Sequence, residues 1–140
     1  MHTKRIIYSL PDGGVAIIMP AVDSGMTLEQ IAAKDVPEGV PFEIVDAASI
    51  PEDRTFRAAW KRDGRKVAHD MPKVRDLAHA RRREVRAAEF APLDAEATIP
   101  GKLAQVETKR QAVRDRHAAL QKQIDRAASP DEVRAVLDRL

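Results

Sequence analysis

The sequence predicts an α+β protein: a small N-terminal β-hairpin or sheet with short helices, followed by a long helical hairpin or an extended helical C-terminal region. Short β-branched runs lie near the N-terminus, and apolar residues recur at helical spacing through the second half. Ala and Arg, which favour helices, are abundant. Aromatic residues are only 4% and charged residues 33% of the 140 residues, so any compact core is modest and largely aliphatic.

The first predicted element is a β-hairpin. The runs KRIIYSL and VAIIM flank PDGG, in which Pro fixes φ, Asp can close an Asx-type hydrogen bond and Gly tolerates a positive φ. These features predict paired strands at Lys4–Leu10 and Val15–Met19.

A short helix and a third strand come next. Thr27 with Gln30 three residues later matches a capping box, and the apolar residues of TLEQIAAKDV lie on one face. VPEGVP ends this helix, and the alternation in PFEIVD predicts a strand at Phe42–Asp46. A sheet of two or three strands is marginal by itself, so this unit needs a partner surface.

The stretch PEDRTFRAAW predicts a further short helix. Ser49 suits a helix start, and Phe56 and Trp60, four residues apart, then share one face. Either these aromatic side chains close the small core by covering the sheet, or they form an exposed partner-binding site with Arg54 and Arg57.

The next segment, KRDGRKV, interrupts the helical pattern at a glycine. The sequence therefore predicts a small α+β module at 1–60, a linker at 61–69 and a helical region at 70–140. Asp70 as N-cap and Pro72 in the first turn predict the start of a long helix, which Pro92 is expected to end or kink. Its apolar face, interrupted by Arg81, consists of Val74, Leu77, Ala78, Val85 and Ala88.

The longest pattern is a heptad seam in steps of three and four residues: Leu103, Val106, Arg110, Val113, His117, Leu120, Ile124 and Ala127. Two interpretations stay open. The seam packs within the chain against 72–90, or it binds a partner chain through Leu103, Val106, Val113, Leu120 and Ile124. A last helix is predicted after Ser129, with Pro130 in its first turn and Glu132 completing a capping box.

The composition excludes several classes of site. The chain has no cysteine, which rules out disulfides, thiolate zinc sites and a cysteine nucleophile. No metal-binding histidine spacing, G-x-S-x-G motif or Walker loop occurs, so we expect no catalytic residue, metal or cofactor. The apolar runs are too short for a membrane span or a signal peptide, which predicts a soluble protein made in a cytoplasm.

The charge is unevenly distributed. Residues 1–60 hold five Lys or Arg and nine Asp or Glu, a net of −4, whereas residues 61–140 hold 19 and 13, a net of +6. The run HARRREVR is the best nucleic-acid candidate, through Arg81, Arg82, Arg83 and Arg86. Interrupting glutamates and the lack of interleaved aromatic residues also fit a solvated or partner-facing helix surface.

Several segments together resemble a family of small bacteriophage tail-region structural or accessory proteins. They are IIYSLPDGGVAIIMPA, IAAKDVPEGVPFEIVDAASIPEDRTFRAAW, DMPKVRDLAHARRREVRAAEFAPLDAE and KRQAVRDRHAALQKQIDRAASPDEVRAVL. The resemblance covers most of the chain, and its most specific part is the D-R-T-F-R-x-A-W block, where Ala58 replaces an expected Asn. No agreed catalytic residue belongs to this family.

The resemblance implies a non-enzymatic protein of the virion, made in the host cytoplasm, that contacts other tail or neck proteins in several copies. One alternative is a tail or tail-fibre assembly chaperone that is absent from the mature particle. The second alternative is a nucleic-acid-binding regulatory protein that uses the basic helix. No membrane partner is expected.

Overall fold

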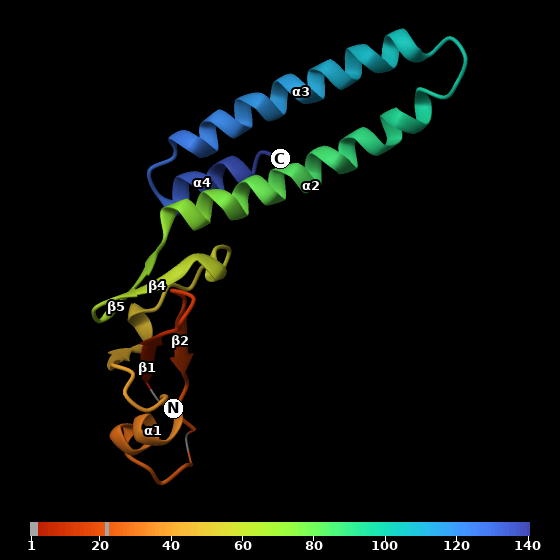
Figure 1. The fold of residues 1–140 in the computed structure, drawn as a ribbon. Coiled ribbons are helices and arrows are strands. Elements are labelled where there is room, and N and C mark those ends of the chain that lie inside the picture. The colour runs from red at the N-terminus through yellow and green to blue at the C-terminus, as the bar shows by residue number, and fades with distance from the viewer. Residues whose placement is uncertain (1–2, 22) are drawn as a thin grey trace. The chain divides into compact units, whose positions relative to one another are not determined.

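A computed structural model describes residues 3–21 and 23–140 (Figure 1). The chain divides into two compact units, Met1–Asp70 and Met71–Leu140, here named the sheet unit and the helical unit. Small antiparallel sheets occupy the first and long helices the second, which confirms the predicted α+β class.

The sheet unit contains a three-stranded antiparallel sheet in the order β2-β1-β3. Its strands are β1 (Lys4–Ser9), β2 (Val15–Ile18) and β3 (Phe42–Asp46), so all three predicted strands are confirmed. In the β1–β2 turn the Asp12 carboxylate accepts the Gly14 N–H at 2.8 Å. Asp and Gly therefore act there as the sequence predicted.

The sheet is apolar on both faces. Ile6 and Ile7, adjacent in β1, are both 0% exposed, and successive side chains of a strand point to opposite faces. On one face α1 (Leu28–Asp35), begun by the predicted Thr27 capping box, packs Ile31 against Ile6. On the other face Ile7 belongs to a second cluster with Trp60. Two small cores thus stabilise a sheet that would be marginal alone.

The helix predicted from Ser49 onward is wrong. The chain forms only two short 3₁₀ turns, Ala47–Ser49 and Arg57–Ala59, before Trp60 opens a strand. Asp53 explains part of the difference, because its carboxylate accepts both the N–H and the hydroxyl of Thr55, at 2.9 and 2.6 Å. Such local side-chain bonds offer the backbone an alternative to the helix.

The segment predicted as a linker is an ordered hairpin of the sheet unit. β4 (Trp60–Asp63) pairs with β5 (Lys66–His69), in register from Trp60↔His69 to Asp63↔Lys66. Gly64, at φ +60°, makes the tight turn that a side chain would strain. The first unit therefore extends to residue 70 rather than 60.

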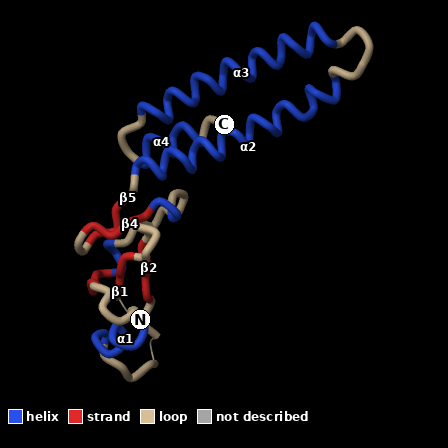
Figure 2. Tube along the Cα trace, viewed as in Figure 1, coloured by secondary structure: helices blue, strands red, loops and turns tan. Residues whose placement is uncertain are grey.

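The helical unit consists of α2 (Met71–Glu96), α3 (Leu103–Arg126) and α4 (Pro130–Leu137) (Figure 2). α2 and α3 run side by side as a hairpin, and α4 packs on both. α2 continues through Pro92 to Glu96, so the expectation that Pro92 ends the helix is wrong. The last turn of α2, which follows Pro92, is held against α3 by the ion pairs Asp94–Arg110 and Glu96–Lys109.

The last helix begins at the predicted cap. The Ser129 hydroxyl accepts the Glu132 N–H at 3.2 Å, and Pro130 lies in the first turn. The Glu132 carboxylate accepts the N–H of Ala128, not that of Ser129 itself, so the reciprocal half of the capping box is shifted by one residue. Within the part of the chain described, no helix is long and apolar enough to cross a bilayer.

Candidate anion-binding site

The aromatic residues singled out by the sequence lie inside the sheet unit. Phe56 is 4% and Trp60 1% exposed. The Trp60 indole donates to His69 Nε2 at 3.1 Å, and the guanidinium groups of Arg57 and Arg54 lie 4.7 and 5.5 Å from its ring centroid. Burial of both rings favours the first of the two open interpretations, in which they close the small core, whereas Arg54 is exposed and Arg57 half-buried.

The heptad seam is likewise occupied within the chain. Val106, Leu120 and Ile124 are buried, and Val113 is half-buried, in a unit where α3 packs on α2 and α4. Leu103 alone among the proposed partner-binding seam residues is well exposed, at 61%. The seam therefore builds the intramolecular hairpin, and Leu103 is its exposed member.

The basic run lines a pocket of the helical unit. A hollow of about 280 Å³, here named the arginine pocket, is lined by Arg82, Arg83, Arg86, Arg114, His117, Ala118 and Gln121. Three of the four arginines predicted as nucleic-acid candidates line it. The fourth, Arg81, points elsewhere and pairs with Glu84 at 3.1 Å.

Helical spacing explains why these side chains meet. Arg82 and Arg86 are four residues apart on α2, and Arg114, Ala118 and Gln121 step by four and three on α3. Residues at these spacings share a face of a helix. Because α2 and α3 pack along their lengths, the two rows meet around one hollow.

Positive charge in the arginine pocket is only partly compensated. Arg82 is 7% exposed and its Nε has no hydrogen-bond partner in the described residues. Burial, and then the neighbouring Arg83 and Arg86, lower its pKa below the ordinary value, while Asp125 opposes the shift. No ion pair of Arg83 or Arg86 is found in the described part of the chain, although Arg86 stacks on the Phe90 ring at 5.0 Å.

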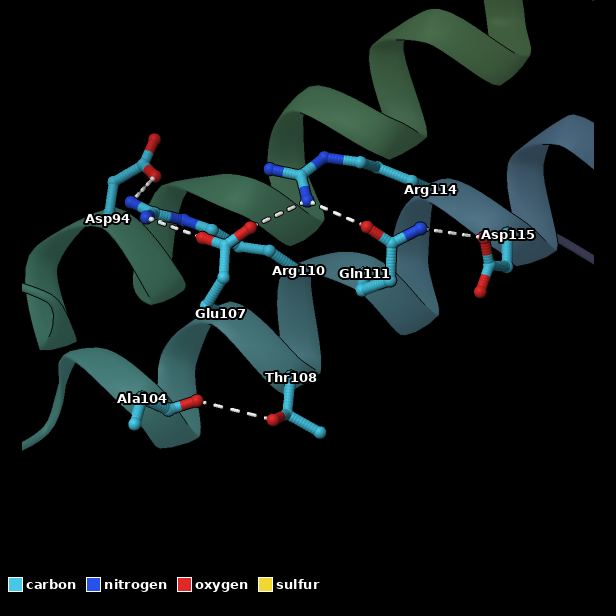
Figure 3. A network of polar contacts seen from close by, with 8 residues as sticks. All are labelled: Asp94, Ala104, Glu107, Thr108, Arg110, Gln111, Arg114 and Asp115. Atoms are coloured by element: carbon cyan, nitrogen blue, oxygen red, sulfur yellow. Dashed lines mark hydrogen bonds and ion pairs between the residues drawn. The ribbon is translucent and has the colours of Figure 1, made fainter.

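Arg114 differs because it belongs to a polar network along the α2–α3 hairpin (Figure 3). Its guanidinium donates to Glu107 at 2.7 Å and to Gln111 at 3.2 Å. Glu107 also binds Arg110, which reaches Asp94 of α2 at 2.6 Å. The network fixes the Arg114 side chain at one end of the pocket.

His117 forms the buried wall of the arginine pocket. It is 1% exposed, its Nε2 lies 3.3 Å from Glu89 Oε1, and its Nδ1 has no partner in the described residues. Burial, followed by Arg116, Arg82 and Arg86, lowers the pKa of His117 below its ordinary value. Glu89 favours the imidazolium, but this carboxylate is shared with Arg116. We therefore take His117 to be neutral at pH 7.

This neutral histidine predicts a pH dependence. An unfolded chain protonates His117 near the ordinary pKa of 6.5, whereas the folded unit does so only at lower pH. Between the folded and the unfolded pKa the unfolded state binds more protons, so the free energy of unfolding of the helical unit falls as pH drops below about 7. Urea unfolding followed by far-UV circular dichroism measures the slope. We expect His117→Gln to flatten it, and an unchanged slope would assign the effect to other groups.

The guanidinium groups of the arginine pocket suit an oxyanion. Guanidinium groups bind carboxylate and phosphate oxygens with paired, charge-assisted hydrogen bonds. In the described ranges no three His, Asp or Glu side chains are placed to hold a metal ion. The charge pattern of the sequence identified the α2 arginines as candidate site residues, but it did not identify Arg114, His117 and Gln121 as part of the same site. The spacing of three and four residues between Arg114, His117 and Gln121 places them on one face of α3 and could have indicated that they belong together.

Comparison with family models, with curated proteins and with solved structures found no match to this chain.

Proposed function

We propose that the chain is a non-enzymatic bacteriophage protein of the tail or neck, which acts by contacts with other virion proteins. The supporting observation is the division into two units that each bury apolar side chains of their own. Two such units can each engage a different component. The D-R-T-F-R-x-A-W block adds support, because this most specific part of the family resemblance contains the core residues Phe56 and Trp60.

Each unit leaves apolar side chains available to a partner. In the sheet unit Met19 is 71% exposed and borders a hollow of about 380 Å³ that Arg54 and Arg57 also line. In the helical unit Ile99 and Leu103, at the α2–α3 connection, are 49% and 61% exposed. These residues, rather than the buried aromatic pair and seam, are the proposed partner contacts. Repeated copies in a symmetric particle make weak individual contacts sufficient.

The test is quantitative mass spectrometry of purified phage particles, compared with the major capsid and tail proteins. A fixed copy number per particle, set by tail or neck symmetry, is the expected result. Detection in infected cells but not in particles would overturn the virion assignment and favour the assembly chaperone. Met19→Ala and Leu103→Ala should lower incorporation without unfolding the protein, whereas Leu10→Ala, also exposed but outside these surfaces, is the control.

A further inference from the structure

We propose that the arginine pocket is a binding site for a phosphate group. This proposal does not depend on the virion assignment. Its starting point is the set of guanidinium groups that converge there, from Arg82, Arg83 and Arg86 on α2 and Arg114 on α3. Only Arg114 has a carboxylate partner at hydrogen-bond distance, Glu107 at 2.7 Å.

The burial of Arg82 is the main reason to expect a bound anion in this pocket. A guanidinium removed from water is unfavourable unless an anion or a set of acceptors compensates it. The Arg82 side chain is only 7% exposed, and its Nε finds no acceptor within the described residues. Asp125 acts on Arg82 only at longer range and already bonds His79 at 2.8 Å. An oxyanion in the hollow would supply the acceptor that the Arg82 Nε lacks.

The number of donors favours phosphate over carboxylate. A carboxylate has two oxygens, which one guanidinium fork can satisfy, whereas a phosphate offers more oxygens in a tetrahedral arrangement to several forks. At about 280 Å³ the hollow is just below the usual size range of ligand pockets, which suits one phosphate group and its immediate substituents.

Acidic groups surround the site. Glu89 lies 3.3 Å from His117 Nε2 and pairs with Arg116. Asp125 with His79 lies toward the α3 C-terminus, and Glu107 with Arg110 toward its N-terminus. Along α3 the positive surface is thus bounded on both sides of the pocket and does not form a continuous track. A bound phosphate would come from a small phosphorylated molecule or from a single backbone position of a nucleic-acid strand.

His117 provides a local readout. Because its imidazole lines the pocket beside Arg82 and Arg86, a bound dianion should favour its protonation. The NMR titration of His117 in the full chain should therefore move to higher pH when inorganic phosphate is added. A general salt effect is controlled by chloride at the same ionic strength.

The decisive variants are Arg83→Gln and Arg86→Gln, since both side chains line the pocket without an ion pair in the described chain. We expect the double variant to weaken binding of inorganic phosphate at least tenfold, measured by NMR shift titration. Arg81→Gln, on the same helix but paired with Glu84, removes one positive charge outside the pocket, as each single pocket substitution does inside it, and should leave binding within about twofold. Circular dichroism checks that each variant keeps its helices.

Two further probes identify the source of the phosphate. Short single-stranded DNA, at about 50 and 200 mM salt, tests the phosphodiester. If DNA binding is lost in the double variant but kept in Arg81→Gln, the phosphate is that of a nucleic acid. Phosphate binding without DNA binding indicates a small phosphorylated ligand. Acetate binding as tight as phosphate, equal effects of all three substitutions, or no saturable binding of either phosphate probe overturns the proposal.

Discussion

Replacing Trp60 by Ala is expected to lower the free energy of unfolding of the sheet unit by about 3–5 kcal/mol. The ring is 1% exposed and packs in the cluster of Ile7, Val15 and Val45, which covers one face of the sheet. Truncation leaves a cavity under that face and removes the indole donor to His69. A loss of this size approaches the whole stability of a small unit.

Hydrogen exchange read by mass spectrometry on peptides from β1 measures this loss within the sheet unit. Protection of β1 should fall strongly in Trp60→Ala and remain near wild type in Met19→Ala, whose side chain is 71% exposed. Trp60→Phe should lie between them, because it keeps apolar area but not the hydrogen bond. Equal protection in wild type and Trp60→Ala would contradict burial of the indole and would favour a role as an interface anchor.

The second large effect is expected for Ile124→Ala, which should lower the free energy of unfolding of the helical unit by about 2–5 kcal/mol. Ile124 is 0% exposed on the α3 face that forms the seam, where α4 also packs. Urea unfolding followed by far-UV circular dichroism measures the change in midpoint.

Leu103→Ala is the matched control, because Leu103 belongs to the same heptad seam but is 61% exposed. Its effect on the unfolding midpoint should be small. A destabilisation as large as that of Ile124→Ala, and dependent on protein concentration, would show that the seam is covered by a second chain and that the intramolecular packing is incomplete.

Elements set by local chemistry could be predicted from the sequence. The Asp-Gly turn, the Thr27 and Ser129 caps and the heptad spacing of α3 each depend on neighbours in the chain, and each matches the structure. The stretch around Phe56 could not be predicted in this way. Two apolar residues four apart fit one face of a helix, but they also fit two buried residues on either side of a short turn. The hairpin at 60–69 carried a usable signal, the Asp63-Gly64 dipeptide.

The site was only partly predictable for a similar reason. Charge identified Arg82, Arg83 and Arg86 on α2, but their pocket needs the α3 face that carries Arg114 and His117. Which faces of two helices meet is set by tertiary packing and register, not by either helix alone. The burial of Arg82 follows from that packing as well.

The position of Trp60 also makes the two units optically separable. It is the single tryptophan of the chain and lies in the sheet unit, whereas the two long helices, α2 and α3, lie in the other. Intrinsic fluorescence therefore follows the sheet unit, and ellipticity follows mainly the helical unit. The separation between the two denaturation midpoints is a direct measure of how cooperatively the units unfold.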